Sequence, residues 1–181
     1  MNKEEIRKFY KKLRDKIPKW RIIEKSLIVI KKFLESPEYL YSNNIMIYMS
    51  YGSEVNTHKL FNTIIKDKGK VILPNCSLKN EKIVPYIVKS FHELRIGTYK
   101  ILEPNENKCI KFENKNNIDI ILVPGIVFDK NGGRIGYGKG YYDKFLSDYN
   151  GFKIGLCFKE YQVPYFTSEI HDISVDKIIC D

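Results

Sequence analysis

The chain has 181 residues, the length of one compact domain, and 43% of them are hydrophobic, which is enough for a buried core. Its net charge of +9 favours a polyanionic partner, either a nucleic acid or a highly charged small molecule. Only 5 of the 31 basic residues are arginine, however, and lysine, asparagine and isoleucine are abundant throughout. A general compositional bias of the host would produce the same charge, so we expect no nucleic-acid partner.

The sequence also argues against a membrane partner, against export of the protein and against a zinc site. It contains no run of about 18 apolar residues, so no membrane partner is expected. Residues 1–10 are charged rather than apolar, which argues against export and predicts a cytoplasmic protein. The four cysteines are spread along the chain without a C-x-x-C motif, so we expect reduced, mostly buried thiols and no zinc site. Without internal repeats or linkers, we expect a single domain over residues 1–181 that acts as a monomer.

Two basic helices are predicted at the amino terminus, over residues 3–16 and 20–34, separated at Pro18 and packed on the domain. Residues 1–36 hold 12 Lys or Arg against 5 Asp or Glu, a difference of +7. Lys3 and Arg7 are like charges one helical turn apart, which taken alone indicates a solvated face. The predicted apolar faces consist of Ile6, Phe9, Tyr10 and Leu13 in the first helix, and Trp20, Ile23, Leu27, Ile30 and Leu34 in the second.

A strand is predicted at residues 45–51, and a polar loop follows it. Thr57 is placed to cap the next helix, which should end near Gly69. Glu54 then lies between a strand and a helix, where open α/β sheets place ligand groups; a plain surface carboxylate is the alternative. Further strands are expected at residues 71–73, 83–88 and 152–158 and at the end of the tail, with Pro74 and Pro85 at or near edges or bends.

The most informative stretch is residues 118–149. Its first six residues, rich in isoleucine and valine, predict a buried strand. Asn131-Gly132-Gly133 supplies the positive φ angles of a tight reversal and predicts a hairpin. A glycine-rich turn at residues 136–140 then opens a helix over residues 141–149. The apolar face of that helix is formed by Tyr142, Phe145, Leu146 and Tyr149.

This glycine-rich turn is a candidate anion site. A turn that opens a helix directs free backbone N–H groups and the positive dipole end at one point, where a phosphate can bind. Lys139 and Arg134 add positive charge. Asp143 is placed either to favour the helix dipole or to hold Mg²⁺. The alternative is a tight connection without a ligand, and the spacing is neither that of a Walker loop nor that of a dinucleotide fingerprint.

These residues resemble the signature of the 5-formyltetrahydrofolate cyclo-ligase family. The match extends over more than 20 consecutive positions. The matching residues are Val123-Pro124-Gly125, Phe128-Asp129, Gly132 or Gly133, Arg134, Gly136, Gly138 and Gly140-Tyr141-Tyr142-Asp143. Among the few departures, Lys139 replaces the glycine of some members and Cys180 stands where threonine is common. The resemblance implies ATP- and Mg²⁺-dependent closure of 5-formyltetrahydrofolate to 5,10-methenyltetrahydrofolate, with ADP and phosphate as the other products.

The resemblance also implies the site residues. Arg134 and Lys139 would act in catalysis, Asp143 and Asp172 would hold Mg²⁺, and Arg14 is a weaker ATP candidate. ATP, the co-substrate, would contact Lys3, Arg7, Arg134, Ile135, Gly136, Tyr137, Gly138, Lys139, Gly140, Tyr141 and Tyr142. The reduced folate would contact Met49, Tyr51, Glu54, Tyr137 and Tyr141, with Glu54 on the pterin ring. His171, beside Asp172, is expected to pack or to face solvent rather than to bind ligand.

The order of strands and helices predicts the fold class. We expect a single-domain, three-layer α/β/α fold with a mostly parallel mixed sheet, to which the hairpin adds antiparallel strands. Glu54, the turn at residues 136–140 and the tail should meet at the carboxyl ends of the strands. Two rival functions remain: a phosphotransferase that uses the same turn on another acceptor, and a basic module that binds nucleic acid through the amino-terminal helices.

Overall fold

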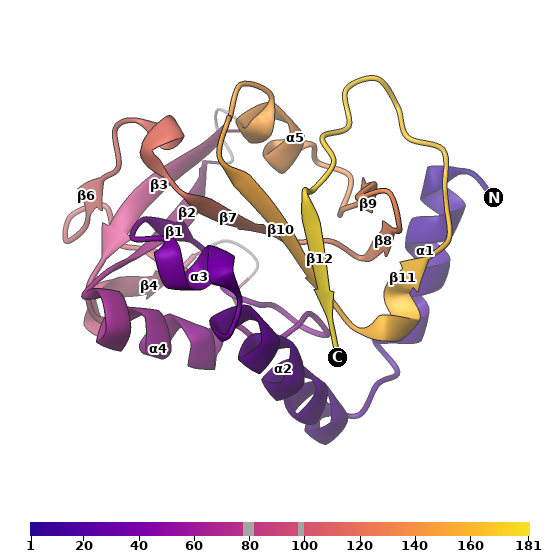
Figure 1. The fold of residues 1–181 in the computed structure, drawn as a ribbon, viewed down its shortest axis with the longest axis horizontal. Coiled ribbons are helices and arrows are strands. Elements are labelled where there is room, and N and C mark those ends of the chain that lie inside the picture. Colours follow the sequence, from indigo (N-terminus) through magenta and orange to yellow (C-terminus); the bar gives the residue numbers. More distant parts are fainter. Residues whose placement is uncertain (78–81, 98–99) are drawn as a thin grey trace.

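The computed structural model describes residues 1–77, 82–97 and 100–181. Within these ranges seven strands form the main sheet (Figure 1). Their order is β12 (Lys177–Cys180), β10 (Phe152–Cys157), β7 (Ile120–Val123), β1 (Ile45–Met46), β2 (Val71–Ser77), β3 (Lys82–Val88) and β6 (Ile110–Lys111). Neighbouring strands from β12 to β2 are parallel, whereas β3 and β6 are antiparallel to the strands beside them. The predicted mixed, mostly parallel sheet is confirmed.

Helices cover both faces of this sheet. On one face lie α2 (Lys19–Leu34), α3 (Pro37–Tyr41) and α4 (His58–Lys68), and on the other lies α5 (Tyr141–Leu146). Successive side chains of a strand point to opposite faces. In β7, Ile120 and Leu122 therefore pack with the first group of helices, while Ile121 and Val123 pack with α5. All four residues of β7 are buried, as expected for a parallel strand covered on both sides.

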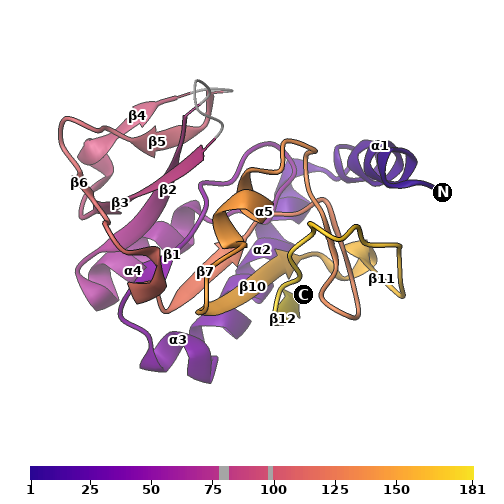
Figure 2. The same ribbon diagram turned by 90° about the horizontal axis from the view of Figure 1, so that it is seen from above.

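Two small sheets and one further helix complete the fold. The strands β8 (Val127–Asp129) and β9 (Arg134–Ile135) form a hairpin, which β11 (Gln162–Val163) joins beside β8. The strands β4 (Leu94–Ile96) and β5 (Leu102–Pro104) pair with each other. Figure 2 shows this pair and α1 (Lys3–Arg14) at opposite ends of the molecule. Single 3₁₀ turns lie at Phe91–Glu93, Lys115–Asn117 and Lys159–Tyr161.

The predicted hairpin is confirmed, but its place in the fold differs from the prediction. Its turn uses a positive φ of 86° at Gly132, and Asn131 does not need one. The hairpin strands belong to the separate sheet with β11, because Gln162 and Val163 pair with β8. The antiparallel members of the main sheet are instead β3 and β6. The helix after the glycine turn ends at Leu146, three residues earlier than predicted.

The predicted apolar faces of the first two helices are partly wrong. In α2, Trp20 and Ile23 are exposed by 66% and 53%, and the buried face is Ile22, Ser26, Val29, Ile30 and Phe33. The polar side chain of Ser26 can be buried because its hydroxyl donates to the Ile22 carbonyl and accepts from the Asn56 amide. In α1 the fully buried side chain is Arg14, whereas Phe9 and Leu13 are exposed.

Three local predictions around β1 and β2 also need correction. Regular pairing of the first strand covers only Ile45–Met46. Thr57 occupies the N-cap position of α4 as predicted, but its side chain makes no capping hydrogen bond. Its hydroxyl instead donates to the Tyr48 carbonyl and accepts from the Ser50 amide, which holds the loop. The helix does end at Gly69, which has φ 74°. Pro74 and Pro85 lie opposite each other inside the β2–β3 ladder. The Pro85 carbonyl accepts from the Phe112 amide, so the backbone nitrogen of Pro85 also points away from β2, and Pro85 removes no donor from the β2–β3 pairing.

Within the described part of the chain, none of the helices combines the length and hydrophobicity that a membrane crossing requires. All four cysteines are free thiols. Cys109 and Cys157 are buried and the other two are half-buried. Cys157 and Cys180 are paired in register on β10 and β12, and their sulfur atoms are 3.1 Å apart.

Candidate active site

One cavity of about 1400 Å³ is lined by every predicted contact residue except Arg14, the weaker ATP candidate. Its wall includes residues that follow β1 and β7 and the carboxyl-terminal half of β2, so it opens at the carboxyl ends of parallel strands. As predicted, Glu54, the turn at residues 136–140 and the tail meet there. The predicted residues that line the cavity are Lys3, Arg7, Met49, Tyr51, Glu54, Arg134, Ile135, Gly136, Tyr137, Gly138, Lys139, Gly140, Tyr141, Tyr142, Asp143 and Asp172.

The glycine turn depends on two positive φ angles and on a close contact with α1. Gly138 has φ 91° and Gly140, the residue before α5, has φ 66°. Arg7 of α1 donates from Nε to the Gly136 carbonyl at 2.8 Å. A Cβ at Gly138 would lie only 3.2 Å from the guanidinium carbon of Arg7, so a glycine is needed for this approach. The first helix is therefore attached directly to the turn that is the candidate anion site of the sequence.

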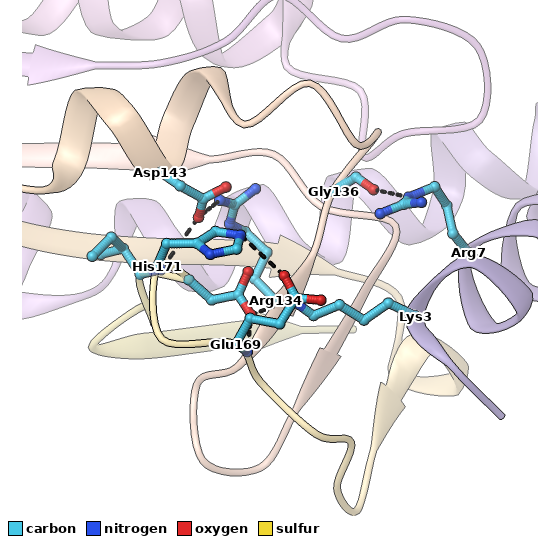
Figure 3. A network of polar contacts seen from close by, with 9 residues as sticks. Lys3, Arg7, Arg134, Gly136, Asp143, Glu169 and His171 are labelled. Carbon is cyan, nitrogen blue, oxygen red and sulfur yellow. Dashed lines mark hydrogen bonds and ion pairs between the residues drawn. The ribbon is translucent and has the colours of Figure 1, made fainter.

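A buried ion pair connects the hairpin to α5. The Arg134 side chain is only 6% exposed and donates to Asp143 Oδ1 at 2.6 Å (Figure 3). The amide of Ile173 donates to the same oxygen at 3.2 Å, which brings the tail to this point. Among the described residues, Nε of Arg134 is buried and has no hydrogen-bond partner. Asp143, predicted as a metal ligand, thus already compensates a buried positive charge.

The second predicted metal ligand lies in an acidic cluster of the tail. Lys3 forms ion pairs with Asp172 and, at 3.5 Å, with Glu169, and His171 Nε2 lies 3.0 Å from Glu169 (Figure 3). Glu169, His171 and Asp172 each offer one ligand atom, and these atoms lie within 4.8 Å of one another. Burial pulls the pKa of Asp172 upward, but hydrogen bonds from Lys3 and from the Glu169 amide outweigh it, and the pKa lies below its usual value.

These donors fit Mg²⁺ in part. Carboxylate oxygens of Asp143, Asp172 and Glu169 are the ligands that Mg²⁺ prefers, whereas a histidine nitrogen is not. Both predicted ligands are paired with basic side chains, Arg134 and Lys3. A phosphate group offers negative oxygens to the same basic side chains. If a metal and a phosphate bound together, the carboxylates could therefore turn to the metal while Arg134 and Lys3 turn to the phosphate. Glu169 was missed by sequence reasoning, although the Glu-x-His-Asp spacing of the tail carried a signal.

Glu54 forms the other functional part of the cavity wall. It is 6% exposed, and its two carboxylate oxygens accept hydrogen bonds from the Tyr51 amide at 2.8 Å and the Tyr137 hydroxyl at 2.7 Å. Burial raises the pKa of Glu54, opposed by these two hydrogen bonds and by the charge of Arg14. Among the described residues, the buried hydroxyl of Tyr142 has no hydrogen-bond partner, although it lines the cavity wall. Glu54 is thus a buried carboxylate beside aromatic rings, not a surface group.

Other residues of the wall carried no chemical signal in the sequence. Glu103 of β5 is 7% exposed and lines the cavity with Ile101 and Leu102. Cys76 of β2 and the buried Tyr48 also belong to the wall. These residues come from segments far apart in the chain, and only the tertiary fold brings them together. Arg14, the weaker ATP candidate, is 5% exposed and lies behind the wall formed by Glu54 and Tyr137.

The chain is similar to known proteins over its whole length. The family model of the 5-formyltetrahydrofolate cyclo-ligase family matches residues 1–181. A probable 5-formyltetrahydrofolate cyclo-ligase of Schizosaccharomyces pombe is 28% identical, over 91% of this chain and 86% of that protein. The 5-formyltetrahydrofolate cyclo-ligase of Saccharomyces cerevisiae is 31% identical, over 77% of this chain and 76% of that protein.

A solved structure is similar to the chain as well. The NMR structure of Aquifex aeolicus 5,10-methenyltetrahydrofolate synthetase has 32% sequence identity and a TM-score of 0.87, and the similarity covers 99% of this chain and 90% of that chain. The fold, the signature residues and the sequence similarity over the whole chain lead to the same conclusion. This chain belongs to the 5-formyltetrahydrofolate cyclo-ligase family.

Proposed function

We propose that the chain catalyses the ATP-dependent closure of 5-formyltetrahydrofolate to 5,10-methenyltetrahydrofolate, with release of ADP and phosphate. One observation carries the proposal: in a chain of this family, a single cavity is lined both by a basic glycine turn and by a buried carboxylate beside aromatic rings. The turn suits a triphosphate, and the carboxylate with its rings suits a pterin. The two substrates of a ligase would thus meet in one cavity.

The chemistry requires activation of a poor leaving group. The formamide oxygen of the substrate leaves with difficulty, and transfer of the γ-phosphoryl group onto it produces a good leaving group. N10 of the folate then attacks the activated carbon and releases its proton, and the bond from that carbon to the phosphorylated oxygen breaks as phosphate departs. Neither step uses an activated water, so the protein contributes mainly alignment and compensation of charge.

Four basic residues are proposed to compensate the phosphate charge. Arg7 is held at the Gly136 carbonyl, which keeps its guanidinium beside the turn. Lys139 belongs to the turn itself and is exposed to the cavity. Arg134 and Lys3 line the same cavity and would exchange their carboxylate partners for phosphate oxygens. Arg134 and Lys139 are proposed as the groups that stabilise charge during transfer.

Asp143 and Asp172 are proposed to hold Mg²⁺. When bound with ATP, this ion neutralises part of the phosphate charge. The two carboxylates belong to α5 and the tail, and the hydrogen bond from the Ile173 amide to Asp143 keeps these segments together. The proposed metal role rests on their position in the cavity and on the oxygen chemistry of the donors.

The folate is proposed to bind through Glu54. A pterin presents adjacent N–H donors, and an ionised carboxylate accepts hydrogen bonds only. The rings of Tyr137 and Tyr141 offer flat faces for the pterin, and Met49 and Tyr51 lie beside Glu54 in the cavity wall. Because burial raises the pKa of Glu54, folate use should fall as the pH drops and the carboxylate becomes protonated.

The test is a near-ultraviolet absorbance assay for the methenyl product, with purified protein, 5-formyltetrahydrofolate, ATP and Mg²⁺. Product should form only with ATP, and Asp143→Asn should reduce it sharply while keeping an oxygen for Arg134. The matched control is Asp148→Asn, which changes a carboxylate that is 74% exposed just after the same helix. Folded protein that forms no product would overturn the proposal.

A further inference from the structure

Arg14 is a buried arginine that the proposed reaction leaves without a role. It is 5% exposed, and its guanidinium donates three hydrogen bonds. The acceptors are Ser53 Oγ at 3.2 Å, the Gly125 carbonyl at 2.8 Å and the Tyr137 hydroxyl at 2.6 Å. They belong to the loop after β1, the turn after β7 and the glycine turn. Among the described residues, no carboxylate forms a direct ion pair with Arg14.

Tyr137 lies between Arg14 and Glu54. Its hydroxyl accepts from Arg14 and donates to Glu54 Oε1 at 2.7 Å. The direction is fixed because a guanidinium can only donate. The single proton of the hydroxyl must therefore point toward Glu54. The Arg14 guanidinium carbon also lies 5.9 Å from the centre of the Tyr137 ring, within the range of a cation–π contact.

Ser53 is oriented in the same way. Its hydroxyl accepts from Arg14 Nε and donates to Asp15 Oδ1 at 2.5 Å. Ser53 precedes Glu54 in the chain, so its attachment to the end of α1 fixes the backbone on which Glu54 stands. Arg14 thus acts on the glutamate from two directions, through a side-chain hydroxyl and through the loop.

We infer that Arg14 is a positioning residue for folate binding, which holds the carboxylate of Glu54 in place through Tyr137 and Ser53. This inference rests on the proposed function, because it takes Glu54 as the folate-binding carboxylate. It also assigns a task to the end of α1, whose start carries the proposed phosphate contacts Lys3 and Arg7. The same helix would serve both substrates.

The charges and hydrogen bonds around Glu54 predict the direction in which its pKa should change when Arg14 is replaced. Burial raises the pKa of Glu54, and the hydrogen bonds from Tyr51 and Tyr137 and the charge of Arg14 oppose that rise. Arg14 is the positive charge in this balance. Its removal should raise the pKa further and move the acid limb of folate use to higher pH. Tyr48 and Tyr142, which are both neutral, also interact electrostatically with Glu54.

The experiment compares Arg14→Met, Arg14→Lys and the control Lys8→Met over a range of pH. Lys8 lies on the same helix, 75% exposed, so its variant removes one charge without touching the cavity wall. For Arg14→Met we expect kcat/KM for 5-formyltetrahydrofolate to fall about 10- to 100-fold, the size expected for lost hydrogen bonds to a charged group. The acid limb should move upward, and the KM for ATP should change less than the KM for the folate. Arg14→Lys should recover part of both effects.

If Arg14→Met fails to fold, a second variant still tests the inference. Tyr137→Phe removes the hydroxyl between Arg14 and Glu54, so it should move the acid limb in the same direction. Where Arg14→Met folds, a double-mutant cycle adds a further test: Arg14→Met should have a smaller effect in the Tyr137→Phe background than in the wild type. Additive effects, or an acid limb that neither variant moves, would overturn the inference.

Equilibrium binding of 5-formyltetrahydrofolate separates this inference from the proposed reaction. A wild type that binds the folate but forms no product overturns the reaction alone, and the Arg14 variants are then compared by their folate affinity against pH. An active wild type whose Arg14→Met variant loses folate and ATP affinity equally overturns the inference alone. A wild type that neither binds nor reacts overturns both.

Discussion

The substitution Gly138→Ala tests how closely α1 is fitted to the glycine turn. An alanine at φ 91° costs about 1–2 kcal/mol of backbone strain. Its Cβ would also lie 3.2 Å from Cζ and 3.4 Å from a terminal nitrogen of Arg7, so the guanidinium must move by a few tenths of an ångström. That movement weakens the hydrogen bond from Arg7 to the Gly136 carbonyl, at a further cost of about 1 kcal/mol.

The expected loss in the free energy of unfolding is therefore about 2–3 kcal/mol, which lowers Tm by roughly 4–12 °C for a chain of this size. The KM for ATP should rise because Arg7 is displaced. Gly69→Ala is the matched control: Gly69 has φ 74°, and no atom lies within 4 Å of the added Cβ. It should lose only the strain energy and keep the KM for ATP. Guanidinium denaturation and the methenyl assay measure both quantities. Equal losses and equal KM values for the two variants would refute the role of the Arg7 contact.

Three further predictions concern stability. Asp143→Ala leaves the charge of Arg134 buried without its partner. Chemical denaturation should show a loss of about 3 kcal/mol in the free energy of unfolding, clearly more than for Asp143→Asn. Equal losses for the two variants would contradict a stabilising role of the ion pair. Thr57→Val removes the hydroxyl that serves two backbone groups of the loop, and denaturation should show a loss of about 2–3 kcal/mol, whereas Thr57→Ser should lose much less. Hydrogen bonds from Lys177 hold the pKa of Glu38 below its usual value, so this carboxylate contributes stability at neutral pH that is lost as the pH falls through the lowered pKa. Glu38→Gln should therefore cost about 0.5 kcal/mol near pH 7, and its denaturation curve should meet that of the wild type in acid.

Features with a local physical cause were predicted well from the sequence. Gly132 and Gly69 occupy the positive-φ positions that end a hairpin strand and a helix. The isoleucine-rich run before Pro124 is a strand buried on both faces. The predicted contact residues from the loop after β1, from the glycine turn and from the tail line one cavity at the carboxyl ends of parallel strands.

Features that depend on distant contacts were not predicted. The buried face of α2 centres on Ser26, whose hydroxyl is satisfied by the Asn56 amide of another loop. Periodicity counts a serine as polar and therefore selected the wrong stripe. Arg14 is buried because three segments supply acceptors for it, and each of them is remote in the sequence. Glu103 lines the cavity from β5, which pairs with β4 and packs against β2.

The position of α1 has a consequence for how the protein is made. Arg7 bonds a residue 129 positions later, and Lys3 pairs with one 169 positions later. During synthesis the first helix leaves the ribosome long before its partners exist, and contacts of such separation are expensive in loop-closure entropy. The parallel strands β1, β2, β7 and β10 can pair beforehand, whereas β12 and the tail residues that line the cavity arrive last. A prematurely terminated chain would thus bury much of its core and still lack a working site.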